Sequence, residues 1–219
     1  MNIKALQLVS LPVRGRCDLI CVIRPEAHTY EKGSSMPRLP AVTATSDLSP
    51  EQHAAAEAVL KVFGHIRGPF SMLLHSPRLA EQLLPLVTFV RETNIVEPSL
   101  RFVGILTAVR ESGADYVWAA QVEQARKNGI REEVIDLIRR GGDPGGLAAD
   151  EREIMMYTQK LLRAKRVDQS TFEMLGRKYS AQWLVELTAI VNFFAFVSGI
   201  CNAFEVDPPV AGDKLRREA

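Results

Sequence analysis

Three side chains in this 219-residue sequence are candidates for acid/base or hydrogen-bonding chemistry: Tyr116, Gln121 and His75. A phenol can give up or accept a proton, whereas a neutral amide can orient a bound molecule by hydrogen bonds but cannot transfer a proton. An imidazole is the side chain best suited to proton transfer near neutral pH. Each also has a structural alternative: Tyr116 can pack in a core, Gln121 can be a satisfied buried amide, and His75 can be a surface or helix-capping residue.

The three cysteines, Cys17, Cys21 and Cys201, give weak signals for metal or disulfide chemistry. Cys17 and Cys21 have the spacing Cys-x-x-x-Cys without a second ligand pair nearby, and the four histidines are scattered, so we expect no metal site. Cys201 lies in an apolar segment, where a small buried hydrophobic residue is expected, although a reactive thiol is the alternative. An odd number of cysteines is untypical of disulfide-stapled secreted domains and predicts a cytoplasmic protein.

Composition and charge indicate a globular protein that does not bind nucleic acid. Apolar residues make up 47% of the chain, which is enough to bury a core, and the formal net charge is +1 with basic residues dispersed along the sequence. The first 35 residues differ from the remainder, because short apolar runs there are broken by charged and polar residues. We therefore predict an N-terminal arm or extension at 1–35, either disordered or paired as a short hairpin, and a helical domain at 36–219.

Residues 98–129 have the pattern of two helices folded back on each other. Apolar residues recur at helical spacing in both halves, and Pro98 is a favourable first residue of a helix because its missing N–H costs nothing there. Gly113 separates the halves, and Gly129 ends the second with the positive φ that glycine tolerates. We predict a tight antiparallel helix hairpin at 99–128.

Helix signals continue on both sides of this hairpin, and no strand pattern follows residue 36. Ser-Pro pairs at 49–50 and 76–77 start helices, and Asp168 is placed to cap a further one. The last helix is predicted at 181–204. Its uncharged part from 187 to 204 is long enough to span a membrane, but several polar residues interrupt it. We expect this helix to be buried in the core or in a subunit interface of an all-α protein, with no membrane contact.

The hairpin resembles that of the carboxymuconolactone decarboxylase and alkylhydroperoxidase D superfamily, which reads roughly Arg-Glu-Leu-x-Ile-Leu, a short turn, and then Tyr-Glu-Trp-x-x-His. The matching residues here are Ile105, Leu106, Tyr116, Trp118 and the helix-ending Gly129. Residues 68–77, Gly-Pro-Phe-x-x-Leu-Leu-His-Ser-Pro, also read as in many members. Three polar positions differ: Phe102 and Val117 stand where the family has acids, and Gln121 stands where it has a histidine.

The resemblance implies an alkylhydroperoxidase D-like helical bundle around the central hairpin, with a small-molecule pocket, assembled as a homo-oligomer (dimer, trimer or hexamer). The catalytic candidates are His75, Tyr116 and Gln121, and the substrate-binding candidates are Phe102, Val117 and Trp118. Trp118 has the alternative of core packing, because an indole buries a large area. With the acids and the histidine replaced, we expect an apolar pocket that prefers a less polar ligand to a dicarboxylated lactone.

Three functions of different classes follow from the resemblance. The first is a cofactor-independent lyase of the decarboxylase-like branch, acting on a small oxygenated, lactone or cyclic substrate by acid/base chemistry. The second is peroxiredoxin-type alkylhydroperoxidase activity, which in that branch uses a Cys-x-x-Cys pair on the second hairpin helix, whereas this chain has no cysteine between Cys21 and Cys201. The third is a non-catalytic ligand-binding or assembly protein. We rank them in this order.

Overall fold

The computed structural model describes residues 37–215, and every regular element in that part of the chain is a helix. The predicted arm at 1–35 lies outside the described residues. The α-helices are α1 (His53–Phe63), α2 (Pro69–Leu73), α3 (Pro77–Thr88), α4 (Pro98–Ser112), α5 (Asp115–Lys127), α6 (Glu132–Arg140), α7 (Ala149–Ala164), α8 (Gln169–Gly176) and α9 (Ala181–Ala203). Short 3-10 turns η1 (Thr45–Asp47), η2 (Pro50–Gln52) and η4 (Pro144–Gly146) and one π-helical turn, η3 (Phe89–Thr93), complete the set.

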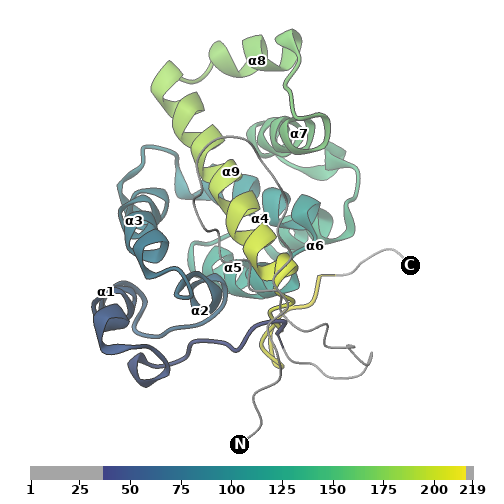
Figure 1. The fold of residues 1–219 in the computed structure, drawn as a ribbon. Helices are drawn as coiled ribbons and strands as arrows, with labels where there is room; N and C mark the ends of the chain where they lie inside the picture. The colour runs from purple at the N-terminus through teal and green to yellow at the C-terminus, as the bar shows by residue number, and fades with distance from the viewer. Residues whose placement is uncertain (1–36, 216–219) are drawn as a thin grey trace, which may run out of the picture. The chain divides into compact units, whose positions relative to one another are not determined.

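The predicted hairpin is confirmed as α4 and α5. Gly113 ends α4 in the left-handed conformation, with φ 62°, and its N–H donates to Arg110 O, so the chain reverses within two residues. Every residue of α4 from 100 to 109 is buried, because α4 packs against α7, α9, α5 and α6. Figure 1 shows α9 crossing α4, with α3 to one side and α6 and α7 to the other. A helix enclosed in this way needs no polar face.

The predicted C-terminal helix is confirmed as α9. The hydroxyl of Ser180 caps it by accepting a hydrogen bond from the Trp183 backbone N–H at 3.2 Å. The Trp183 indole N–H donates to Glu97 Oε2 at 2.7 Å, which ties the start of α9 to the start of α4. Among the described residues, α9 is the one helix long and apolar enough to cross a membrane by length and composition, and 56% of its most apolar window is buried inside the protein. It serves here as a core helix.

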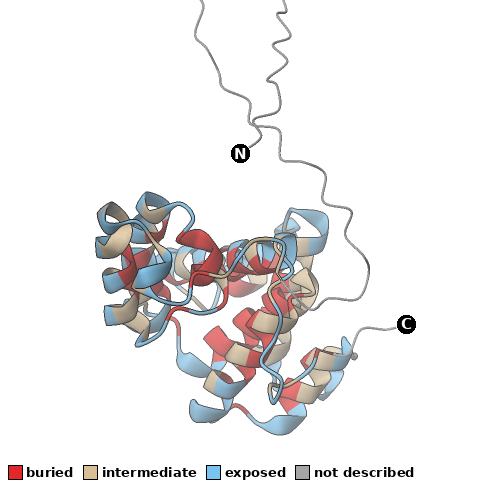
Figure 2. Ribbon diagram, turned by 60° about the horizontal axis from the view of Figure 1, so that its bottom comes forward, coloured by how far each residue is buried: buried red, intermediate tan, exposed pale blue. Residues whose placement is uncertain are grey.

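The other predicted helix starts are found with one change. Asp168 caps α8 by accepting from Thr171 N–H at 3.0 Å. The helix expected from 49 starts as the 3-10 turn η2, in which Gln52 Oε1 accepts from Ser49 N–H, and the α-helix itself begins at His53. Figure 2 shows the buried residues gathered on the helix sides that face one another, with exposed residues on the outer sides. The apolar core therefore follows the periodicity in the sequence.

The close packing of α4 on its neighbours predicts a stability difference between two glycine substitutions. A Cβ on Gly104 would lie 3.2 Å from Leu187 Cδ1 and 3.5 Å from Val191 Cγ2, so Gly104→Val should overfill the core and lower the free energy of unfolding by about 1–3 kcal/mol. Gly199 in α9 has no atom within 4 Å of such a Cβ, so Gly199→Ala should raise it by about 0.5–1 kcal/mol. Urea unfolding of both variants measures these free energies. A Gly104→Val protein as stable as wild type would contradict the close contact of α4 with α9 at Gly104.

Candidate functional site

A cavity of about 430 Å³ lies beside the hairpin and is lined by segments between residues 63 and 128 and by part of α9. The hairpin supplies one side through α4 and α5, and α9 supplies another. The loop after α1, the start of α2, the end of α3 and the turn η3 close the remainder. Aromatic rings form part of its walls, with side chains from Phe63, Phe70, Phe102, Phe193, Phe194 and Tyr116, and charged and amide side chains form another part. Such a cavity suits a small molecule with both an apolar and a polar part.

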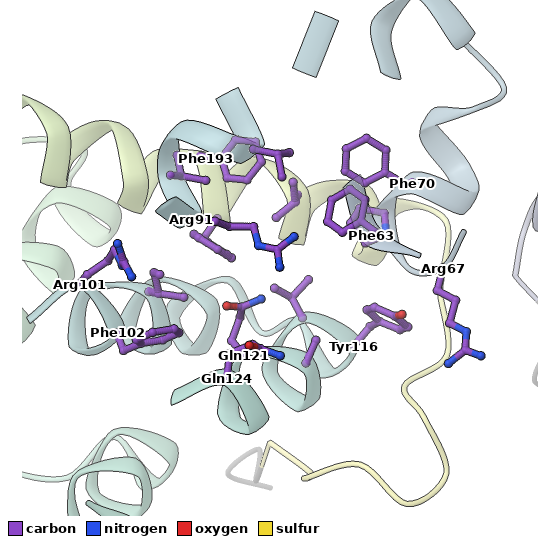
Figure 3. A pocket seen from close by; sticks show the side chains of 18 of the residues that line it. Phe63, Arg67, Phe70, Arg91, Arg101, Phe102, Tyr116, Gln121, Gln124 and Phe193 are labelled. Atoms are coloured by element: carbon purple, nitrogen blue, oxygen red, sulfur yellow. The ribbon is translucent and has the colours of Figure 1, made fainter. Parts of the chain in front are cut away.

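One side of α5 faces this cavity. Val117, Gln121 and Gln124 line it, at the spacing of four and three residues that places side chains on the same side of a helix. Figure 3 shows the amide of Gln121 directed into the cavity. The amide is half-buried and has no hydrogen bond with any residue that the structure describes, so it is available to a bound molecule as donor and acceptor.

Tyr116 stands at the edge of the cavity and also lines a second hollow near the end of α9. Its ring lies against Gly68: a Cβ there would be 2.1 Å from Tyr116 Cε1, and Gly68 has φ +60°. Only glycine permits this approach. Burial raises the pKa of Tyr116, and the nearby Cys201 adds to the increase, while the charge of Arg67 opposes it. The phenol is therefore a proton donor at neutral pH and not a base.

Three arginines, Arg67, Arg91 and Arg101, also line the cavity. Arg101 is only 9% exposed, and its Nη1 donates to Asn94 Oδ1 at 3.3 Å. The Arg101 guanidinium lies 5.7 Å from the Phe102 ring centroid and that of Arg91 lies 5.3 Å from the Phe63 centroid. The expected apolar pocket is thus corrected to a cavity with both apolar and polar walls, which contains positive charge. The sequence analysis considered the acid and histidine positions of the family motif and not its arginine, on which Arg101 falls, although a charged residue inside the apolar run of α4 pointed to it.

Four of the six predicted site residues line the cavity, namely Phe102, Tyr116, Val117 and Gln121. His75 does not: it is exposed, and its Nε2 donates to Pro40 O at 2.8 Å. The imidazole that lines the cavity is that of His65, next to Phe63, with ring centroids 6.4 Å apart.

Trp118 is also placed away from the cavity. It is fully buried in the core, and the Arg139 guanidinium lies 5.7 Å from its ring centroid. The reason is helix geometry, because each residue turns by about 100° from the preceding one, which takes position 118 off the side shared by Val117 and Gln121. The predicted contact of Trp118 with a ligand is therefore replaced by its alternative of core packing.

Cys201 is buried on α9 and lines the second hollow, not the main cavity. Desolvation raises the pKa of its thiol from 9.0 to about 12. A thiol attacks peroxides as the thiolate, so this environment opposes the reaction. Within residues 37–215 it has no second cysteine to resolve an oxidised form. Cys17 and Cys21 lie outside the described residues.

No protein-family model matches this sequence, and no curated protein matches it. Among solved structures, the alkylhydroperoxidase D core of a peroxidase-related protein from Ralstonia eutropha JMP134 superposes with a TM-score of 0.66 at 15% identity, over 80% of this chain and 93% of that one. A peroxidase-related protein from Silicibacter sp. TM1040 gives 0.63 at 13% identity, over 82% and 95%. The debrominase Bmp8 gives 0.60 at 17% identity, over 78% and 92%.

These likenesses extend over nearly the full length of the matched structures, so they define the architecture. The chain has the alkylhydroperoxidase D-like fold, as the resemblance of its hairpin implied. At such low identity the likeness is one of fold, and the activity has to be argued from the cavity itself.

The raised pKa of Cys201 predicts a loss of stability at alkaline pH. In the unfolded chain the thiol loses its proton near its ordinary pKa of 9.0, whereas burial keeps it protonated in the folded protein up to about 12. Between these values the folded state holds more protons than the unfolded state, so the free energy of unfolding falls as pH rises. Urea unfolding under reducing conditions, at a series of pH values above and below 9, measures this fall. In Cys201→Ala the fall should be smaller, and an equal fall in both proteins would show that another group causes it.

Proposed function

We propose that this protein is a cofactor-independent enzyme that binds a small oxygenated cyclic molecule in the cavity and moves a proton on it, in the manner of the decarboxylase-like branch. The observation that carries the proposal is the joint placement of Tyr116 and Gln121 on α5, where a protonated phenol and an amide with no described partner border one aromatic cavity.

The roles follow from the chemistry of each group. Gln121 hydrogen-bonds an oxygen of the substrate and fixes its orientation, since an amide donates and accepts but does not titrate. Tyr116 donates a proton or a strong hydrogen bond to an oxygen on which negative charge develops. His65 takes the place of His75 as the candidate base, because it is the imidazole among the lining residues. Phe102 and Val117 shape the wall where the family has acids.

A variant of Bmp8, which shares the fold, has been solved in complex with 2,3,4-tribromopyrrole. This supports the proposal in one respect: a small flat ring is a ligand of the size that a cavity of about 430 Å³ accepts. It does not support thiol chemistry here, because the cavity of this chain has no cysteine among its lining residues. A non-catalytic ligand-binding protein is the second candidate, favoured by the presence of a single carboxylate, Glu92, in the lining.

Proton transfer is tested by deuterium exchange into a butenolide such as α-angelica lactone, followed by NMR in D2O. Tyr116→Phe should slow exchange by about 100-fold or more, the usual loss for a general acid. Gln121→Leu should slow it by roughly twofold to tenfold, corresponding to one hydrogen bond of about 0.5–1.5 kcal/mol, with almost unchanged thermal stability. Trp118→Phe is the matched control, since it changes a core residue outside the cavity: it should lower stability and leave the exchange rate unchanged.

A protein that shows no exchange with such lactones, yet binds them in a Gln121-dependent way, would favour the non-catalytic candidate. A Gln121→Leu protein that is several degrees less stable with full activity would instead make Gln121 a structural amide. Hydroperoxide reduction that disappears in Cys201→Ser would return thiol chemistry to first place.

We further propose that the protein assembles with copies of itself through the outer side of α9. Val185 and Phe196 lie on that side, eleven residues and about three turns apart, with exposed fractions of 67% and 41%. Apolar side chains grouped on one helix side are typical of an interface. Size-exclusion chromatography with light scattering should give a mass that is a multiple of 24.3 kDa, and Phe196→Glu should reduce it. A monomeric wild type would contradict this.

A further inference from the structure

We infer that the ligand of this cavity is a small aromatic or alicyclic monocarboxylate, whose single carboxylate is held by Arg101, while Arg91 adds positive charge elsewhere on the cavity wall. The inference rests on the proposed function in taking the cavity as the ligand site, and it adds the charge of the ligand, which the proposed proton transfer leaves open. It also reverses the expectation from the motif that a carboxylate is disfavoured here.

Arg101 carries most of this inference. Its side chain comes from the buried run of α4, and it is 9% exposed. The side-chain partner that the structure gives it is the neutral Asn94 Oδ1, at the long distance of 3.3 Å, and no carboxylate among residues 37–215 forms an ion pair with it. Desolvation lowers the pKa of Arg101, which shows that burial works against its charge. A guanidinium nevertheless stays protonated, and a carboxylate bound beside it would offset the hydration that burial removes.

Arg91 supplies a second positive charge from the opposite side. It comes from the turn η3, and Figure 3 shows its guanidinium and the Gln121 amide pointing toward each other across the cavity. Arg91 is exposed and has no ion pair in the described part of the chain. Glu92 is the one carboxylate among the lining residues, against three arginines, and it pairs with none of them. Arg67 points outward beyond Tyr116 in Figure 3 and belongs to the rim.

The walls determine which anion fits. Phe63, Phe70, Phe193 and Phe194 supply apolar surface to the cavity, which an inorganic anion would leave unfilled. A second carboxylate on the ligand would lie against these rings without a partner, which costs several kcal/mol. A planar ring with one carboxylate fits this lining. The ring covers the apolar surface, and the carboxylate binds a guanidinium through two parallel hydrogen bonds.

The test compares benzoate with benzamide, which has nearly the same shape and no charge. Isothermal titration of the full-length protein measures both, on wild type, Arg101→Met, Arg91→Met and Arg177→Met. Arg177 is the matched control, since its side chain is 80% exposed and lies outside the cavity lining. Methionine keeps the apolar stem of the arginine and removes the charge. Arg91 is exposed, so Arg91→Met keeps the test decisive even if Arg101→Met folds poorly.

Wild type should bind benzoate about tenfold or more tightly than benzamide, the difference expected for a charge-assisted pair. Arg101→Met should lose about tenfold for benzoate and stay within about twofold for benzamide, and Arg91→Met should show a smaller loss of the same kind. Arg177→Met should match wild type. The inference is overturned if benzamide binds as well as benzoate, if neither binds, if both cavity variants bind benzoate like wild type, or if phosphate or phthalate competes more strongly than benzoate itself.

The two proposals fail in different ways. Arginine-dependent binding of benzoate without proton exchange on any lactone would remove the enzymatic function and keep the anion site. Exchange that depends on Tyr116 but is unaffected by Arg101→Met and Arg91→Met, with benzamide bound as well as benzoate, would keep the enzyme and remove the anion site.

Discussion

The burial of residues 100–109 of α4 is the constraint on which the other features of this structure depend. Between residues 100 and 109 the helix is covered by α7, α9, α5 and α6, so it has no side on which a charged residue can reach bulk water freely. Gly104 lets Leu187 and Val191 approach closely enough to close the α9 side. Arg101 is the one charged residue in that buried run, and the side that remains for it is the cavity. The position of a positive charge in the site is thus a consequence of core packing.

The turn at Gly113 fixes the position of α5 relative to the buried helix α4. Because the chain reverses within two residues, α5 is held against α4, and the side bearing Val117 and Gln121 meets the side bearing Arg101 and Ile105 across the same space. The close contact of Tyr116 with Gly68 then fixes the start of α5 against the loop before α2. The turn at Gly113 could be predicted from the sequence, whereas the contact between Tyr116 and Gly68 could not, because it joins residues 48 positions apart.

Local sequence signals were sufficient to predict the helices but not to predict which residues line the cavity. The hairpin, the capped start of α8 and the long α9 follow from caps, glycine stops and apolar periodicity, which act within a few residues of the chain. The cavity joins residues from 63 to 197, and its contents depend on which way each helix is turned. Tyr116, Val117 and Gln121 could be found because they share one helix with the family motif. His75 and Trp118 were misplaced because sequence adjacency does not give orientation. Arg101 falls on the arginine of the family motif but was not weighed as a site residue, and Arg91 was missed because it lies outside the motif.

The replacement of the family's acids and the absence of a carboxylate partner for Arg101 have the same effect on the charge of the cavity: both leave it more positive. In the resembled family an acid stands at the position of Phe102 and another at that of Val117, where each would add negative charge to this cavity. Here the Arg101 guanidinium lies over the Phe102 ring, a neutral partner that stabilises a cation only weakly. With Gln121 in place of a histidine, no group from α5 titrates at that position either. The substitutions therefore do more than remove proton-transfer groups: they leave a buried positive charge without a carboxylate in the described chain, and a bound carboxylate is the simplest chemical group that completes it.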